Sequence, residues 1–247
     1  MSFGGQGAPW VAVAHSLKAR YFLHAGDYAK ALDETKKGIA TESGTLFAFY
    51  STNALEYSPW GHWVNDEGGS IRATKSFVDL LKSEVGDRRL IQYFSPNDSG
   101  HIIGYSATGS TEEKKITSVS NILKYGSYSD NFPIISSFEN TLIRAECEAR
   151  TGDVASAVTH VNIIRTNAGL TNFVSANRDS TIAQVLKQKH LQLFLEGQNY
   201  NDMRRTKTLP DPVAGKNYRI NYPLSETNAN PNVPADADVL AKPLLGY

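Results

Sequence analysis

The sequence predicts a mainly α protein built on tetratricopeptide-like helix pairs, with a loop-rich irregular insertion between them. Two segments share the pattern of such a pair: residues 19–32 read ARYFLHAGDYAKAL, and residues 145–158 read AECEARTGDVASAV. Aligned without gaps, both have an alanine, a Gly-Asp pair and two further alanines at the same positions. Glycine can end the first helix, aspartate can cap the second, and alanines let two helices approach closely. We expect one domain over residues 1–247.

The first helix pair is predicted over residues 8–40. Its first helix has an apolar face at helical spacing, formed by Trp10, Ala14, Leu17 and Tyr21. Its second helix has a matching face formed by Tyr28, Ala31, Leu32 and Ile39.

Residues 41–137 form the predicted loop-rich region. This stretch holds most of the aromatic residues and many glycines and serines, but few long periodic runs. We expect a short helix over 71–81 and short strands over 90–94 and 101–105. Pro133 interrupts the chain before the next helix.

The second helix pair is predicted over residues 138–170. Its first helix has an apolar face formed by Phe138, Leu142, Ala145 and Ala149, and its second has one formed by Val154, Ala157, Val158 and Val161. Gly169 stands where a glycine commonly ends a helix. The only cysteine, Cys147, lies in this pair; it is expected to be a small buried apolar residue.

A long helix is predicted over residues 180–206, where residues 180–205 read STIAQVLKQKHLQLFLEGQNYNDMRR. Ser180 and Thr181 are N-cap candidates. The acids and arginines at its far end (Glu196, Asp202, Arg204 and Arg205) are more simply interpreted as helix-end and inter-helix contacts than as a site. The tail, residues 207–247, is rich in proline and asparagine and is predicted to be an extended segment packed on the body.

Composition and spacing exclude several classes of function. The chain has 25 basic and 25 acidic residues, so it lacks the excess positive charge typical of nucleic-acid binding. The six histidines and one cysteine show no metal-ligand spacing, and no nucleophile elbow or phosphate loop occurs, so we expect no catalytic residue, metal or cofactor. A pair of carboxylates suited to glycoside hydrolysis remains open, because it needs only proximity in space.

The segment YSPWGHWVND, residues 57–66, is the candidate binding site. Tyr57, Trp60 and Trp63 could offer flat faces on which sugar rings stack, while Asn65 could hydrogen-bond sugar hydroxyls. The alternative is that these aromatic residues fill the core of the loop-rich region. Since Trp60 and Trp63 are three residues apart, only one would face solvent if the segment is helical.

Three segments resemble the SusD/RagB family of outer-membrane nutrient-binding lipoproteins. The family's tetratricopeptide unit is matched at residues 142–170, which read LIRAECEARTGDVASAVTHVNIIRTNAGL. The start of the chain matches through Trp10, Ser16, Leu17 and Arg20, and the end through the sequence YPLSE from Tyr222. The sequence departs from the family at Gln188, Lys189 and Gln192, where an acid–arginine pair and a second acid are usual.

The resemblance covers the C-terminal half of a typical member. The part of such a member that has the signal peptide, the lipidated cysteine and the first two repeats has no counterpart here. The resemblance implies non-catalytic binding of an oligosaccharide or similar nutrient at the outer membrane, on the cell surface. It also implies hand-over to a SusC-like TonB-dependent transporter. A tetratricopeptide-like protein-binding scaffold and a glycosidase are the alternatives.

Overall fold

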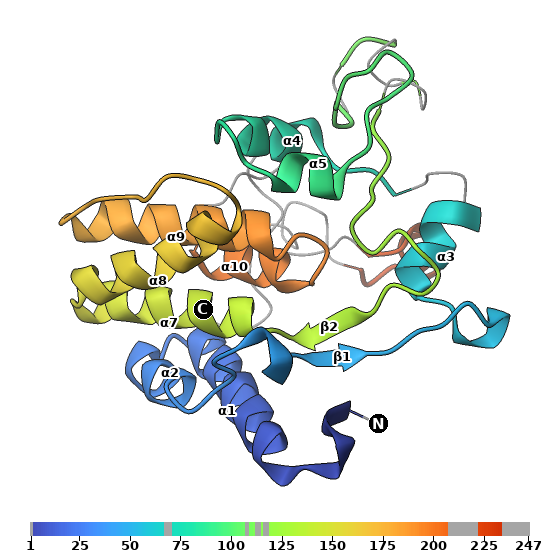
Figure 1. Cartoon of the computed structure of the whole chain (residues 1–247). Helices are drawn as coiled ribbons and strands as arrows, with labels where there is room; N and C mark the ends of the chain where they lie inside the picture. Colours follow the sequence, from blue (N-terminus) through green and yellow to red (C-terminus); the bar gives the residue numbers. More distant parts are fainter. Residues whose placement is uncertain are drawn as a thin grey trace.

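The computed structural model describes residues 2–66, 71–106, 109–111, 115, 119–206 and 222–233 (Figure 1). The helix pairs and the segment after them contain α1 (Gly7–His24), α2 (Tyr28–Thr35), α7 (Ser137–Thr151), α8 (Val154–Asn167), α9 (Arg178–Gln192) and α10 (Gln198–Thr206). The remaining helices are α3 (Pro59–Asp66), α4 (Lys75–Lys82), α5 (Arg89–Tyr93) and α11 (Leu224–Ala229), and two short strands are β1 (Leu46–Ala48) and β2 (Phe132–Ile135). The mainly helical fold predicted from the sequence is confirmed.

The two helix pairs, α1–α2 and α7–α8, use the same turn. Gly26 and Gly152 have φ angles of 76° and 104°, which a residue with a Cβ rarely adopts. Asp27 then accepts a hydrogen bond from the amide of Lys30 in its own helix, and Asp153 does the same for Ser156. The aspartate caps and glycine turns that the repeat predicted are therefore present in both pairs.

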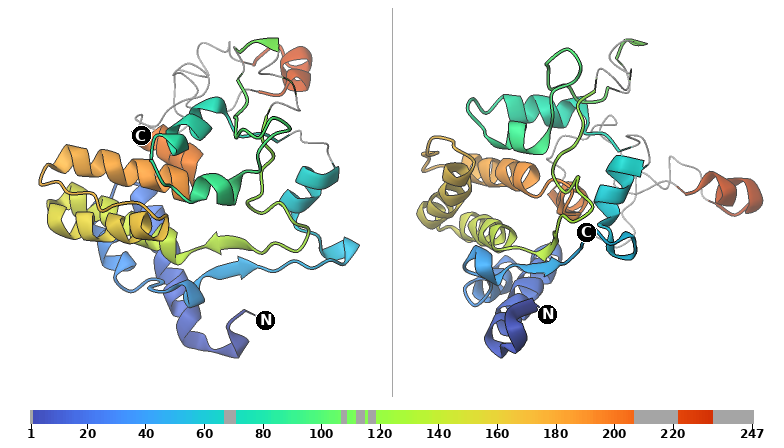
Figure 2. Two further views of the ribbon diagram at one scale, coloured as in Figure 1. Left: turned by 45° about the horizontal axis from the view of Figure 1, so that its top comes forward. Right: turned by 45° about the vertical axis from the view of Figure 1, so that its right-hand side comes forward.

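Helix α7 lies at the centre of the helical layer and contacts α1, α2, α8 and α9 (Figures 1 and 2). Its predicted apolar face packs against α8 and α9 in a cluster that includes Leu142, Ala145, Val161, Ile164 and Val185. Its opposite face meets α1 and α2 through Ala19, Leu23, Ala31, Ile143 and Cys147. Burial raises the pKa of Cys147 to about 12, which fits the predicted role as an inert apolar residue.

The predicted apolar face of α1 is wrong. Trp10 and Tyr21 are 47% and 64% exposed, and the buried residues are instead Val13, Ser16, Ala19 and Leu23. Small side chains allow the close approach of α1 to α7: the Ser16 hydroxyl donates to the Asn140 side chain at 3.1 Å and accepts from the Ile39 amide at 2.8 Å. Close packing and buried hydrogen bonds select this face over the larger aromatic side chains.

The predicted long helix over residues 180–206 is two helices. The break lies between α9 and α10, where Leu195 and Gly197 have φ angles of 69° and 77°. The true N-cap of α9 is Asn177, whose side chain accepts from the Ser180 amide at 2.8 Å. The turn lets α10 fold back, so that Asp202 meets Lys189 of α9.

The loop-rich region adds a layer beside the helices (Figure 1). Residues 90–93 belong to helix α5 instead of the expected strand, and only Phe94 is extended, in an isolated β-bridge with Ile122. Helix α4 begins after Thr74, whose hydroxyl accepts from the Phe77 amide. An aromatic cluster ties this layer to the end of α9, because the Phe194 ring stacks on Phe77 at 4.3 Å. Strands β1 and β2 pair antiparallel and connect the loop-rich region to α7.

Most of the predicted extended tail, residues 207–247, lies outside the described residues. Its described part, 222–233, contains the short helix α11. Among the residues that the structure describes, no helix has both the length and the apolar character needed to cross a bilayer.

Candidate functional site

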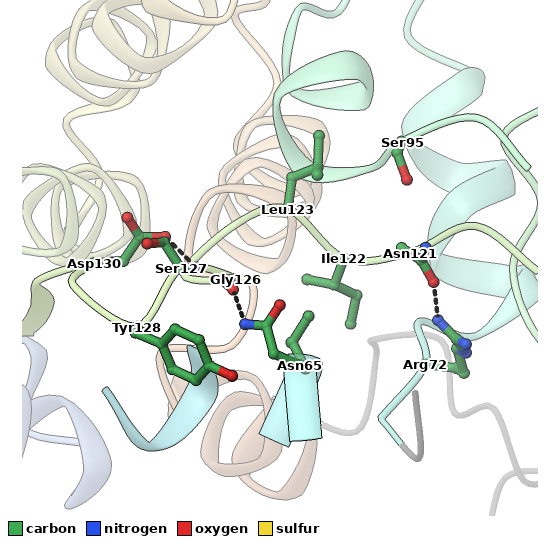
Figure 3. A pocket seen from close by; sticks show the side chains of 11 residues that line it. Asn65, Arg72, Ser95, Asn121, Ile122, Leu123, Gly126, Ser127, Tyr128 and Asp130 are labelled. Atoms are coloured by element: carbon green, nitrogen blue, oxygen red, sulfur yellow. Dashed lines mark hydrogen bonds between the residues drawn. The ribbon is translucent and has the colours of Figure 1, made fainter. Parts of the chain in front are cut away.

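An open pocket of about 720 Å³ lies in the loop-rich region, within the range typical of small-molecule sites. It is formed by α3, the segment before α4, the segment after α5 and the segment 121–130. Its lining is mostly polar: the residues are Val64, Asn65, Arg72, Ser95, Asn121, Ile122, Leu123, Gly126, Ser127, Tyr128 and Asp130 (Figure 3).

Helix α3 is held tightly against the segment 126–128. A Cβ built on Gly61 would lie 2.2 Å from the backbone oxygen of Ser127, so only glycine permits this approach. Ser58, which is buried just before α3, donates a hydrogen bond from its backbone amide to the backbone oxygen of Tyr128 at 2.7 Å. The glycine and serine within YSPWGHW thus place one wall of the pocket.

Asn65 and Tyr57, two of the four predicted site residues, lie at this wall. The Asn65 side chain lines the pocket and donates to the backbone oxygens of Gly61 at 2.6 Å and Gly126 at 2.8 Å. Tyr57 stacks on Tyr128 with ring centroids 4.1 Å apart. Because Tyr57 covers one face of Tyr128, the Tyr128 ring borders the pocket with its other face or its edge.

The hydroxyl of Tyr128 is fixed as well. It donates to the Asp66 carboxylate at 2.6 Å, and this hydrogen bond raises the pKa of Tyr128. Asp66 also pairs with His62 on the same helix. The ring of Tyr128 is therefore held by a stacked neighbour and by a hydrogen bond, which is the pre-organisation that a stacking platform needs.

Trp60 and Trp63, the other two predicted site residues, do not line the pocket. Trp60 is half-buried and packs on Phe132, with ring centroids 6.5 Å apart. This matches the alternative given above for the aromatic residues, in which they fill the core instead of binding a ligand. Trp63 is 46% exposed on α3. The helical segment thus turns one tryptophan inward and the other to solvent.

The far end of the pocket is formed by Arg72, Asn121 and Ser95. Arg72 donates to the Asn121 side-chain oxygen at 2.5 Å, and the Ser95 amide donates to the Asn121 backbone oxygen at 3.0 Å. Figure 3 shows Arg72 and Asp130 at opposite ends of the lining, with Asn65 and Ile122 between them. Asp130 accepts from the Ser127 amide at 2.9 Å.

Three residues, Lys124, Tyr125 and Glu196, are called the latch here. They connect the segment 121–130, called the pocket segment below, to the turn between α9 and α10. Lys124 and Tyr125 both donate to one oxygen of Glu196, at 2.9 and 2.8 Å. Lys124 also donates to the backbone oxygens of Gln192 and Phe194, both at 2.9 Å. Tyr125, with a φ of 60°, and Leu195 are both in left-handed backbone conformations, which the surrounding contacts must hold.

Asp202 and Arg205 of the C-terminal motif form a buried ion cluster with Glu146 and Lys189, and these four residues are called the ion cluster below. Arg205 donates to both oxygens of Glu146 at 2.6 Å and to Asp202 at 2.6 Å. Lys189 lies 3.0 Å from Asp202. These contacts join α7, α9 and α10, so the prediction that the motif is architectural is confirmed for these residues.

Sequence reasoning missed Arg72, Asn121, Tyr128 and Asp130. They stand outside the aromatic motif, in stretches whose polar, turn-rich composition indicates only a loop. The one available signal was the repetition of tyrosine and turn-forming residues in KYGSYSDN, residues 124–131. In the part of the chain that the structure describes, no group of three or more potential ligands could hold a metal ion.

Comparison with known proteins places the chain in a family. The model of the SusD family matches residues 49–239, which is well over half of the chain. No curated protein matches it.

Solved structures with the same fold are numerous. A SusD/RagB family protein from Bacteroides thetaiotaomicron has a TM-score of 0.67 and 21% identity, covering 96% of this chain and 64% of that protein. A SusD superfamily protein from Parabacteroides distasonis has a TM-score of 0.63 and 20% identity, covering 90% and 61%. A protein described as chitin-binding has a TM-score of 0.66 and 16% identity, covering 93% and 61%.

At these identities the likeness shows the fold, and the chain spans 64% or less of the length of these relatives. The family match, the shared fold and the helix pairs agree with one another. The chain belongs to the SusD family, whose members are generally non-catalytic nutrient-binding proteins of the Bacteroidetes.

Proposed function

We propose that this protein binds an oligosaccharide in the pocket beside α3, without breaking a bond in it. The observation that carries the proposal is the fixed Tyr128 ring at the edge of a polar pocket that Asn65, Asn121 and Ser127 also line. A sugar ring presents an apolar C–H face to an aromatic ring and hydroxyls to amides and carboxylates. Membership of a nutrient-binding family and likeness to a chitin-binding protein support the same function.

The charges of the pocket favour binding over hydrolysis. Most glycoside hydrolases use two carboxylates that flank the bond to be cleaved. Among the described residues that line this pocket, Asp130 is the only carboxylate, and it already accepts a backbone hydrogen bond from Ser127. We therefore assign the pocket a capture role.

Trp63 extends the proposed site beyond the pocket. It stands on α3 two residues before Asn65 and is partly exposed. In this proposal Trp63 contacts a part of the saccharide that projects from the pocket, whereas Trp60 supports α3 from within. Tyr57 acts by holding Tyr128 in place.

The partner in this proposal is a SusC-like TonB-dependent transporter, which receives the saccharide at the outer membrane of the cell surface. Family membership supports this step. Co-purification of the chain with the product of a neighbouring transporter gene would test it. Recovery of the chain without that transporter under mild detergent extraction would count against hand-over.

Calorimetric titration with a panel of oligosaccharides tests the binding step. The panel includes chitohexaose, neutral glucan hexamers and uronic-acid oligomers. Replacement Tyr128→Ala should weaken binding of the preferred saccharide by about tenfold or more, because it removes the aromatic surface and its anchoring hydrogen bond. Tyr21→Ala, an exposed tyrosine on α1, is the matched control and should bind as the wild type does. Equal binding by both variants would refute the site.

A further inference from the structure

The charge of the ligand can be inferred from Arg72, the one cation among the described residues that line the pocket. In the described part of the chain its guanidinium has a single hydrogen-bond partner, the neutral side-chain oxygen of Asn121. Its Nε atom is buried and has no hydrogen-bond partner. A buried donor without an acceptor costs about 1–3 kcal/mol, and more when the group is charged.

The Arg72 guanidinium is partly withdrawn from water, and no carboxylate of the described chain pairs with it to offset the cost. Withdrawal from water lowers the pKa of Arg72. Three arginines elsewhere in the molecule that are largely withdrawn from water pair with a carboxylate: Arg89 with Asp87, Arg165 with Glu84, and Arg205 with Glu146. Arg204 also has a buried Nε atom without a hydrogen-bond partner, but its guanidinium lies over the Tyr200 ring. Arg72 has no such pair in the described chain, although it lies in a pocket where a ligand could supply one.

The carboxylate of the pocket itself does not neutralise Arg72. Asp130 lies at the opposite end of the lining, bound to the Ser127 amide (Figure 3). The group beside Arg72 is the Asn121 amide, and Ser95 lines the pocket farther along (Figure 3). A guanidinium next to an amide provides several donors to one anionic group.

We propose that the saccharide bound here is acidic, and that the carboxylate of a uronic acid residue binds Arg72. This inference rests on the proposed function and names its ligand class. Guanidinium and carboxylate are both planar and form paired, charge-assisted hydrogen bonds, so one carboxylate can bind two nitrogens of the Arg72 guanidinium. The sugar ring would then extend toward Asn65 and Tyr128 along the lining.

Calorimetry with trigalacturonate and with the same trisaccharide after reduction of its carboxylates to alcohols tests the charge. We expect the wild-type chain to bind the acidic form at least about tenfold more tightly, and we expect added salt to narrow that ratio. A sulfated trisaccharide forms a third arm. Tighter binding of the sulfated sugar would overturn the assignment to a carboxylate.

Replacement of Arg72 links the preference to this residue. In Arg72→Gln the ratio of affinities for the acidic and the reduced trisaccharide should fall to about one. Arg178→Gln is the matched control, because Arg178 is exposed and donates only to the Arg150 backbone oxygen among the described residues. It should keep the wild-type ratio.

The outcomes separate this inference from the proposed function. Equal wild-type affinity for the two trisaccharides, with binding still lost in Tyr128→Ala, would overturn the acidic ligand while keeping saccharide capture. A preference for the acidic form that survives Arg72→Gln would overturn the role of Arg72. Failure of the wild-type chain to bind any saccharide of the panel would overturn both.

Discussion

Arg205 and Arg72 show how differently two regions of this molecule use the same side chain. Arg205, in the ion cluster, donates to both oxygens of Glu146 and to Asp202. Arg72, in the pocket, donates to one neutral oxygen and leaves a buried nitrogen without a partner. The first arginine has its interactions completed by the fold, whereas the second has interactions that a ligand can complete.

The same contrast separates the regions around them. In the ion cluster two carboxylates pair with two cations at the junction of α7, α9 and α10, and Arg150 is a further cation paired with Glu146. Burial alone would raise the pKa of Glu146, but Lys189 and Arg205 outweigh burial and hold this pKa well below its usual range. The most patterned part of the sequence is therefore architecture, and the less patterned loop-rich region contains the candidate site.

Breaking the ion cluster should have the largest effect on stability. Arg205→Met removes the cation that bridges Glu146 and Asp202 and leaves these buried carboxylates to Lys189 and Arg150, so we expect the free energy of unfolding to fall by about 3–5 kcal/mol. Denaturant unfolding followed by circular dichroism measures it. Arg178→Met, at an exposed site, should change stability by less than about 0.5 kcal/mol. A loss below about 1 kcal/mol in Arg205→Met would show that the cluster is not architectural.

Breaking the latch should affect both regions. Glu196→Gln keeps an acceptor for Tyr125 but removes the charge that neutralises the buried Lys124, so we expect a loss of about 2–3 kcal/mol in unfolding free energy. Saccharide affinity should also fall, because Leu123 and Gly126 of the pocket flank the latch. Asp79→Asn is the control, since its pair with Lys75 lies on the surface. Lost stability with unchanged affinity would show that the latch does not position the pocket.

The close approach of α3 to the pocket segment can be tested at Gly61. Gly61→Ala places a methyl group 2.2 Å from the Ser127 oxygen, which forces α3 outward. We expect a loss of about 2 kcal/mol in stability and weaker saccharide binding. Gly7→Ala adds a methyl group with nothing within 4 Å and should be neutral. If Gly61→Ala binds saccharide as the wild type does, the wall formed by α3 is dispensable.

Acid should weaken the fold through two histidines, His24 in α1 and His190 in α9. Burial, as the largest cause, lowers the pKa of His24 and of His190 from 6.5 to about 4. As the pH falls, the unfolded chain therefore protonates these two histidines at a higher pH than the folded chain does. The stability that comes from keeping His24 and His190 neutral is lost as the pH falls from about 6.5 toward 4. Allowing for solvent screening, we expect a loss of about 1–2 kcal/mol between pH 7 and 5.

Denaturant unfolding at several pH values, with two variants, measures this dependence. His190→Phe should flatten the profile, because the new ring can keep the contact with Phe77 without titrating. His101→Phe, at an exposed position, should leave the profile as in the wild type. A wild-type profile that is flat between pH 7 and 5 would contradict the neutral, buried state of His24 and His190.

Arg72→Gln should have the smallest effect on stability. Since no carboxylate of the described chain pairs with Arg72, we expect the free energy of unfolding to change by no more than about 0.5 kcal/mol. Thermal and denaturant unfolding of the unliganded variant measure this. If Arg72→Gln lowered the free energy of unfolding as much as Arg205→Met does, Arg72 would be an architectural arginine. The contrast between Arg72 and Arg205 would then not hold.

The sequence predicts best where local chemistry decides the structure. Glycine turns and aspartate caps at Gly26, Asp27, Gly152 and Asp153 follow from backbone preferences, and the structure confirms them. The apolar face of α1 fails, because the spacing of large residues does not reveal that Ser16 forms buried hydrogen bonds with distant partners. The choice between two possible faces depends on tertiary packing.

The site was only partly predictable for the same reason. Composition directs attention to YSPWGHWVND, and Asn65 and Tyr57 do lie at the pocket wall. Its other side comes from Asn121 and Tyr128, more than fifty residues later in the chain. No sequence pattern marks Arg72. Its hydrogen bond to the neutral Asn121 side chain, without a carboxylate partner in the described chain, depends on which residues folding brings together. Such juxtapositions arise from folding and have no local pattern.

One nuclear magnetic resonance titration tests the central claim, that ligand binds in the loop-rich pocket and the helix pairs serve as architecture. The ¹⁵N-labelled chain is titrated with trigalacturonate while its backbone amide signals are followed. We predict that shifts concentrate at Asn65, Arg72 and residues 121–130, and that amides of α7 and α8 stay in place. Shifts confined to the helix pairs, with those pocket amides unmoved, would contradict the account and favour a tetratricopeptide-like scaffold.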